Sequence, residues 1–302
     1  MIRKRSLPPG WYPESPDKIR AFLGQFEGNL PDRGAFAAVA PHAGWYYSGS
    51  LAARAIAALQ GPAGAAGAET VVVIGGHLPR GYPPLFVEED DVETPLGVLP
   101  VDGEFRDLLR SELGGRPDTF RDNTVEVQLP MVKFFFPRAK LLALRLPAEA
   151  ASFDAGKGIA RIGASLGRRL AVLGSTDLTH YGYNYDFCPQ GQGKGALEWV
   201  RTVNDRTFIA AVIAGDPREV LSRAEEDRSA CSAGAALGCL GYAEALAAGK
   251  AAVRAELLAY GTSADAADPY GGGDEVPDSF VGYAALAWYP ARDITLSSSS
   301  RA

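Results

Sequence analysis

The chain has 302 residues, with 36 acidic against 30 basic side chains and a formal net charge of −6. An acidic chain without a basic run does not have the composition of a nucleic-acid binder, and no stretch reaches the roughly 18 uninterrupted apolar residues that indicate a membrane span. Three cysteines without a Cys-x-x-Cys pair, and an N-terminus without the apolar segment of a secretory signal, favour a cytoplasmic protein.

Short apolar runs typical of buried strands recur along the chain. They cover residues 35–40, 71–76, 140–146, 169–175, 253–261 and 280–289. The stretches between them have a helical pattern at residues 49–59, 105–113, 153–166, 197–214 and 232–248, with Ser48 available as N-cap of the first. This alternation predicts an α/β fold, with a mainly parallel central sheet flanked by helices on both faces.

Three other segments depart from this alternation. Residues 85–102 have the pattern of a β-hairpin or an antiparallel extension, with a turn near Pro95 and Gly97. Residues 263–279 form a polar, Gly-rich loop, and residues 293–302 are expected to be a disordered tail. Because no linker divides the chain, we expect a single domain over residues 1–302.

The chain has three histidines, and each follows a predicted strand: His42, His77 and His180. In open α/β sheets, ligands bind beyond the carboxyl ends of the strands. One such histidine is most often an ordinary loop or core residue, but three in this position favour a shared metal site.

Side chains near the histidines add to this hypothesis. Asp177, three residues before His180, could orient an imidazole, raise its basicity, bind metal or cap a turn. Together, Asp177 and His180 could form an acid/base pair. Trp45 and Tyr46, just after His42, could wall a substrate pocket, although core packing explains each equally well.

Five ordered segments resemble the Memo family, whose bacterial and archaeal members are often labelled AmmeMemoRadiSam system protein B. PHAGWYYSG, GGHLP and STDLTHYG resemble its three histidine motifs, DNTVEVQLPM its glutamate segment and DRSACSAGAA its cysteine segment. The resemblance implies a fold similar to that of LigB-type class III extradiol dioxygenases, which hold non-haem Fe(II) with two histidines and a carboxylate. It implies His42 and His77 as metal ligands and Cys231 in place of the carboxylate. Asp177 and His180 would then lie in the region of the dioxygenase base.

One position departs from the family pattern. Memo proteins often have a histidine ahead of the glutamate where this chain has Asn123, and an amide cannot shuttle protons. Glu126 remains as either a pocket carboxylate or a helix-start residue.

Two imidazoles and a thiolate suit Fe(II) or Cu, with Zn as a further metal. Without the resemblance, Cys231 would be interpreted as a buried structural thiol.

Three protein ligands leave a coordination position open, as in catalytic sites. The resemblance therefore implies a metal-binding protein with redox or oxygenase-like chemistry. The alternatives are an Fe(II) extradiol-type dioxygenase and a non-enzymatic protein whose pocket binds a small molecule, a peptide or a partner. The family label further implies radical SAM and AMMECR1-like proteins as partners in a modification pathway.

Overall fold

A computed structural model describes residues 1–27, 34–61, 67–247, 253–266 and 276–290 of the chain. The predicted tail at residues 293–302 and part of the predicted loop at residues 263–279 lie outside these ranges.

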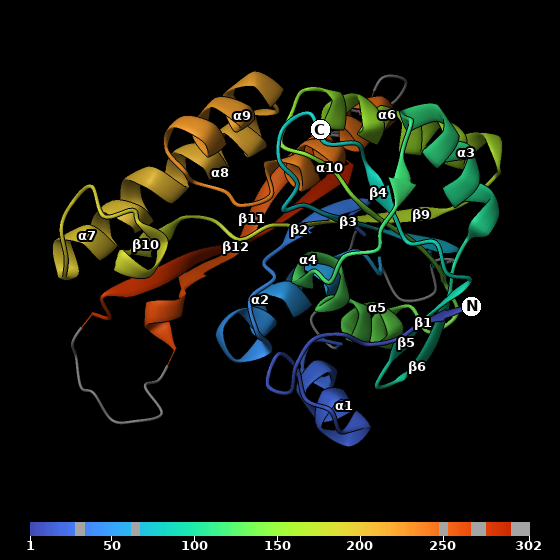
Figure 1. Ribbon diagram of the computed structural model, residues 1–302, viewed down its shortest axis with the longest axis horizontal. Coiled ribbons are helices and arrows are strands. Elements are labelled where there is room, and N and C mark those ends of the chain that lie inside the picture. Colours follow the sequence, from blue (N-terminus) through green and yellow to red (C-terminus); the bar gives the residue numbers. More distant parts are fainter. Residues whose placement is uncertain (28–33, 62–66, 248–252, 267–275, 291–302) are drawn as a thin grey trace, which may run out of the picture.

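Four parallel strands form the centre of a large mixed sheet (Figure 1). They lie in the order β2 (Ala37–Ala40), β9 (Leu170–Ser175), β3 (Thr70–Gly75) and β8 (Lys140–Arg145). All residues of β2 and β3 are buried, which explains their continuous apolar sequence. The predicted α/β fold with a mainly parallel centre is confirmed.

Antiparallel strands extend this sheet at both ends. At one end β12 (Ser279–Pro290) pairs with β2, and both β11 (Val253–Thr262) and β10 (His180–Gly182) pair with β12. At the other end β4 (Leu85–Phe86) pairs with β8, and β7 (Arg116–Pro117) lies beside β4.

The predicted hairpin lies in a second, smaller sheet. It consists of β5 (Asp91–Thr94) and β6 (Gly97–Pro100), and β1 (Ile2–Arg3) pairs with β5. The antiparallel extension of the main sheet is therefore made by β10, β11 and β12 together with β4, and not by the hairpin. Hydropathy did not reveal this, because β12 is as apolar and almost as fully buried as the parallel strands.

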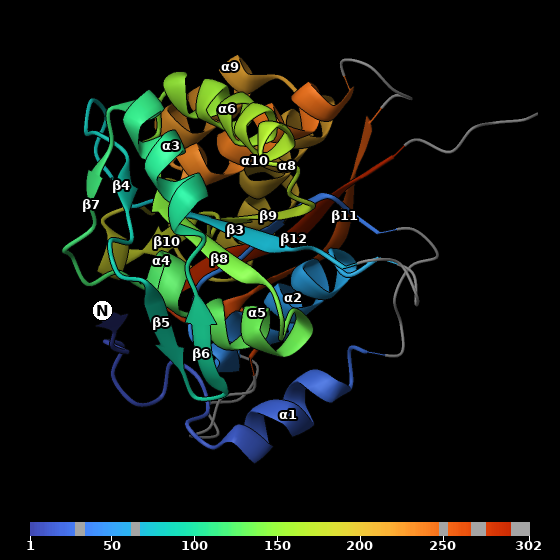
Figure 2. The same cartoon turned by 90° about the vertical axis from the view of Figure 1, so that its right-hand side faces the viewer.

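Helices cover both faces of the main sheet (Figures 1 and 2). Alternate strand residues point to opposite faces, so Val73 belongs to one apolar core and Val72 to the other. The first core is covered by α1 (Pro16–Gly24), α2 (Trp45–Ala58) and α5 (Leu129–Phe135). The second is covered by α3 (Gly103–Leu113), α6 (Ala151–Ser165), α8 (Asp205–Ala214), α9 (Pro217–Glu226) and α10 (Ala233–Ala247).

Two helices differ from their predicted bounds. α2 begins at Trp45 with Gly44 as N-cap, so the expected N-cap Ser48 lies inside the helix and donates to the Ala43 carbonyl instead. The helix predicted over residues 197–214 consists of α7 (Lys194–Trp199), a π-helical turn at Val200–Asn204 and α8. Among the helices in the described part of the chain, we find none with the length and apolar character needed to cross a membrane.

Candidate metal centre

The four central strands deliver polar side chains to one edge of the sheet, because all four run in the same direction. His42 follows β2, Asp177 follows β9, His77 follows β3, and Arg145 is the last residue of β8. This edge is the ligand-binding edge of open α/β sheets.

His42 is buried and held on three sides. Its backbone N–H donates to Asp177 Oδ1 at 2.6 Å. Its ring nitrogen Nδ1 lies 3.2 Å from Ser175 Oγ, and Nε2 lies 3.2 Å from Cys231 Sγ. The imidazole is therefore fixed with Nε2 toward the cysteine.

His77 reaches the same point from a strained backbone. Its φ of 56° lies in the left-handed region, which is uncommon for a residue with a side chain and is often found at functional sites. Gly76 before it is required, because a Cβ there would lie 2.4 Å from Ser232. The rings of His42 and His77 meet edge to face, with centroids 4.9 Å apart.

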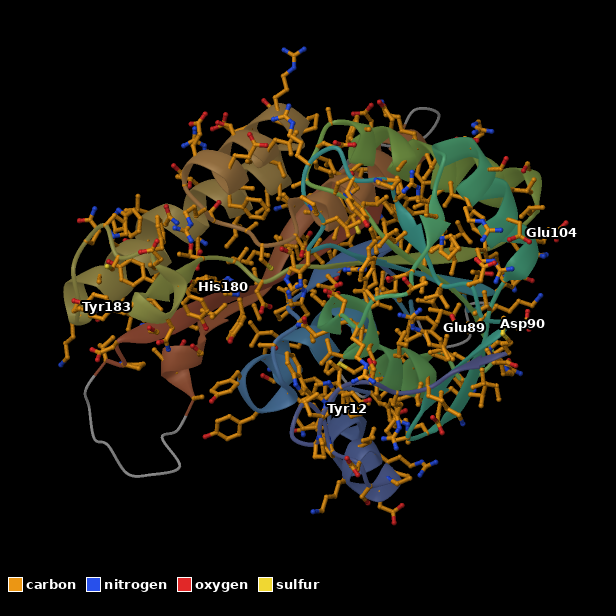
Figure 3. All side chains as sticks on the ribbon, viewed as in Figure 1. Tyr12, Glu89, Asp90, Glu104, His180 and Tyr183 are labelled. Carbon is orange, nitrogen blue, oxygen red and sulfur yellow. The ribbon has the colours of Figure 1, made fainter. Side chains whose placement is uncertain are left out.

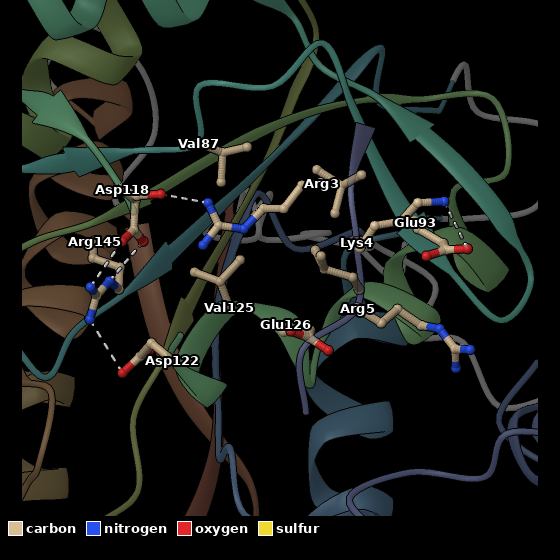
Figure 4. A pocket seen from close by; sticks show the side chains of 12 residues that line it. Arg3, Lys4, Arg5, Val87, Glu93, Asp118, Asp122, Val125, Glu126 and Arg145 are labelled. Carbon is tan, nitrogen blue, oxygen red and sulfur yellow. Dashed lines mark hydrogen bonds and ion pairs between the residues drawn. The ribbon is translucent and has the colours of Figure 1, made fainter. Parts of the chain in front are cut away.

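A buried ion-pair chain orients His77 from behind. Asp122 Oδ2 lies 3.1 Å from His77 Nδ1 and 3.3 Å from Arg145 Nη1. Arg145 in turn donates to both oxygens of Asp118, at 2.9 and 3.0 Å (Figure 4). A carboxylate on the far ring nitrogen is the usual support of a metal-binding histidine, since it leaves the other nitrogen for the metal.

This arrangement shifts the pKa values of the pair in opposite directions. Burial lowers the pKa of His77, but the hydrogen bonds to Asp122 and Cys231 outweigh it and raise the pKa to about 9. For Asp122, burial raises the pKa, but the bonds from His77 and Thr124 outweigh it and lower the value to about 2. Without a metal, the two side chains therefore form an ion pair at neutral pH.

Cys231 completes a cluster of three donor atoms. It lies two residues before α10, and its backbone N–H donates to the Asp177 carbonyl at 3.2 Å. The ligand atoms of His42, His77 and Cys231 all lie within 4.8 Å of one another. Around a four-coordinate ion with metal–nitrogen distances of about 2.0 Å and metal–sulfur distances of about 2.3 Å, donor atoms stand roughly 3.5 Å apart. The cluster therefore fits a metal ion after small side-chain movements.

Asp177 and His180 lie beside the cluster but have different hydrogen-bond partners. Asp177 Oδ2 is 3.9 Å from His42 Nε2, and no hydrogen bond in the described part of the chain joins Asp177 to His180. His180 is the first residue of β10, on the side of the molecule formed by β10 and β12 (Figure 3). Its Nδ1 donates to the Leu178 carbonyl at 3.0 Å, and burial lowers its pKa.

A cleft of about 700 Å³ opens onto His42, His77, Asp177 and His180. Asn123 lines it and donates to the His42 carbonyl at 3.0 Å. Further lining comes from the N-terminal segment, α2 and the β10–β12 region, at Pro9, Gly10, Trp11, Ala43, Gly44, Tyr47, Tyr185, Ser263, Pro277, Ser279, Val281 and Tyr283.

The structure does not bring Trp45, Tyr46 or Glu126 to the lining of this cleft. Trp45 is buried in the core, where its indole N–H donates to the Val127 carbonyl. Tyr46, more than half exposed, lines a separate and mostly apolar groove that includes Tyr12 and Trp45. Of the four residues predicted for the substrate pocket, only Asn123 lies on the histidine cleft.

Glu126 instead anchors the N-terminal segment. Its carboxylate accepts hydrogen bonds from the backbone N–H groups of Ser6 and Leu7, both at 2.9 Å, and from the Tyr12 hydroxyl at 3.2 Å. The Glu126 contacts place residues 9–11 against the cleft. The sequence did not predict that this segment lines the cleft, and it did not predict that Asp122 and Arg145 support His77. The only local signal was the position of Asp122 as N-cap of α4 (Asn123–Glu126).

Fold and site together define an α/β protein with a His/His/Cys cluster that could bind a metal at the carboxyl edge of its sheet. A family model described as Memo-like protein matches residues 3–287, and the chain belongs to this family.

Similar sequences come from archaea. A MEMO1 family protein from Methanosarcina barkeri is 29% identical over 94% of this chain and 99% of its own. One from Pyrococcus horikoshii is 29% identical over 91% of this chain and 95% of its own. A solved structure of an uncharacterized protein from Escherichia coli K12 is 11% identical and covers 72% of this chain and 85% of that one, with a TM-score of 0.39, too low to support an argument.

Proposed function

We propose that this Memo-like protein holds a redox-active, non-haem metal ion with His42, His77 and Cys231. The observation that carries the proposal is the convergence of three donor atoms from three separate segments within 4.8 Å. Two imidazoles and one thiolate favour Fe(II) or Cu, with Zn as the redox-inactive alternative, over Mg or Ca.

The metal would supply redox or Lewis-acid chemistry at a position open to the cleft. His180, beside the metal position, would accept or donate a proton during the reaction. A carbonyl only accepts, so the Nδ1 that bonds to Leu178 carries the proton and Nε2 keeps its lone pair. Because burial lowers the pKa of His180, the ring is neutral at pH 7 and suited to act as a base. The Asp177 carboxylate would hold His42 in place by accepting a hydrogen bond from the His42 backbone N–H.

Metal analysis of the full chain, purified without chelators and then reloaded anaerobically with Fe(II), Cu or Zn, tests the proposal. We expect close to one equivalent in the wild type and strong loss in His77→Ala and Cys231→Ser. Cys188→Ser is the matched control, because Cys188 is also a partly exposed free thiol but does not belong to the cluster. Equal binding by wild type and Cys231→Ser would refute the proposed ligand set.

Two alternatives predict other results. An Fe(II) extradiol dioxygenase would cleave catechols in an aerobic screen of the iron-loaded protein. The proposed replacement of a carboxylate by Cys231, and the presence of Asn123, argue against it. A non-enzymatic protein in a cytoplasmic pathway with radical SAM and AMMECR1-like partners would capture these proteins in pull-downs. It would also keep its cellular phenotype in His42→Ala.

A further inference from the structure

The charged side chains that line the histidine cleft favour a cationic ligand over an anionic one. Among the described residues that line it, Asp177 is the single carboxylate, and there is no lysine or arginine. The His77 ring already has the Asp122 carboxylate 3.1 Å from its Nδ1. An anionic ligand would therefore find no free cationic side chain in the lining, whereas a cationic ligand would find a carboxylate.

One oxygen of the Asp177 carboxylate accepts a hydrogen bond within the protein, and the other does not. Oδ1 accepts the His42 backbone N–H, but Oδ2 is 3.9 Å from His42 Nε2, which is beyond hydrogen-bond distance. The residue is only 4% exposed. Because Asp177 lines the cleft, a ligand there can donate a hydrogen bond to this oxygen.

Aromatic side chains form the walls around this carboxylate. Trp11, Tyr47, Tyr185 and Tyr283 line the cleft, and Tyr185 packs edge to face against His180 with centroids 4.9 Å apart. Burial raises the pKa of Tyr185 and Tyr283, and the nearby charge of Asp177 raises both further. Aromatic faces attract an ammonium group, and they also stack on a flat ring.

One feature of the cleft would favour an anion. The N-terminus of α2 reaches the lining at Gly44, and helix N-termini attract negative charge. However, the Trp45 N–H at this end already donates to the Trp11 carbonyl at 2.8 Å, and the Tyr47 and Ser48 N–H groups donate to the Gly44 carbonyl. This helix end therefore offers little free hydrogen bonding to an anion.

We infer that the cleft selects a small aromatic ligand that carries a protonated amine, with the ammonium paired to Asp177, and rejects its carboxylate counterpart. The inference rests on the proposed function for its site, since it names the class of molecule that would reach the metal.

Tyramine and 4-hydroxyphenylacetate provide a matched test, because they share a phenol ring and a short side chain but carry opposite charges. Binding of each to the metal-free full chain is measured by calorimetry and by NMR. We expect tyramine to bind at least about tenfold more tightly. Asp177→Asn keeps an oxygen acceptor for the His42 N–H and should abolish the preference. Tyr47→Leu, on the half-exposed surface of α2, should weaken tyramine binding several-fold. Asp154→Asn, an exposed carboxylate on α6, is the control that should change nothing.

Any of three results with the metal-free protein would overturn the inference: equal or tighter binding of the acid, a preference retained by Asp177→Asn, or no binding of either compound at millimolar concentration. A preference that appears only in metal-loaded protein would also overturn it, because the metal and not Asp177 would then select the ligand. Since the comparison is made without metal, failure of metal binding leaves this test intact.

Discussion

Asp122 links the buried Arg145 to the histidine cluster, so its charge should control how the stability of the metal-free protein depends on pH. Asp122→Asn tests this cleanly. Asp122 Oδ1 accepts the Thr124 N–H as N-cap of α4, and asparagine caps helices about as well as aspartate. The substitution therefore keeps the cap and removes the charge that faces His77 Nδ1 at 3.1 Å.

The magnitude follows from the pKa of His77, which rises from 6.5 to about 9 in the folded protein. A raised pKa stabilises the folded state fully below the unfolded value of 6.5, and this contribution is lost as the pH rises through about 9. At roughly 1.4 kcal/mol per pH unit, the difference corresponds to about 3 kcal/mol. The His77 side chain is 34% exposed, and solvent screening reduces the expected effect to about 1–2 kcal/mol. The lowered pKa of Asp122 describes the same ion pair and is not added.

Urea unfolding of chelator-treated wild type and Asp122→Asn at pH values from about 6 to 10 measures this difference. The wild type should be more stable at the acidic end, and its advantage should shrink by about 1–2 kcal/mol as the pH rises through 9. A residual offset from the lost Arg145 contact should remain at every pH. The same comparison in a Cys231→Ser background removes the contribution of the thiol. Parallel pH curves for wild type and variant would refute the reasoning.

Two further predictions concern the anchoring of the N-terminal segment and the close packing of β12 against Asp205. Glu126→Gln should cost about 1–3 kcal/mol of unfolding free energy and speed amide exchange in the N-terminal segment, because that carboxylate accepts several of the segment's N–H and O–H groups. Unchanged exchange there would contradict the anchoring role. Gly282→Ala should lower the free energy of unfolding by more than about 2 kcal/mol, because the new Cβ would lie 2.0 Å from Asp205 Oδ2. Gly195→Ala is the control, since Gly195 lies on α7 with open space around it. This variant should leave the free energy of unfolding unchanged or raise it by up to about 1 kcal/mol. Equal stabilities of these two glycine variants would show that the close approach is not limiting.

The pattern of the sequence determined the central strands and the positions of His42 and His77 directly after two of them. A strand buried on both faces needs an unbroken apolar run, and this requirement is local. The polar residue that follows such a run is equally visible. Strand ends of a parallel sheet share one edge, so the sequence predicted both imidazoles at that edge. Their close approach also required the strand order, which separates β2 from β3 by β9 alone.

Tertiary structure alone decided which segments meet. Cys231 contacts His42 across 189 positions of chain, and only the family resemblance indicated this contact in advance. Asp122 and Arg145 stand behind His77, Glu126 holds the N-terminal segment, and Trp45 is a core residue, although all of them lie in segments whose local pattern permits other roles. β12 runs antiparallel to β2 although it is as apolar as the parallel strands. Hydropathy records how deeply a residue is buried, but the partner of a side chain and the direction of a strand depend on long-range packing that no local pattern encodes.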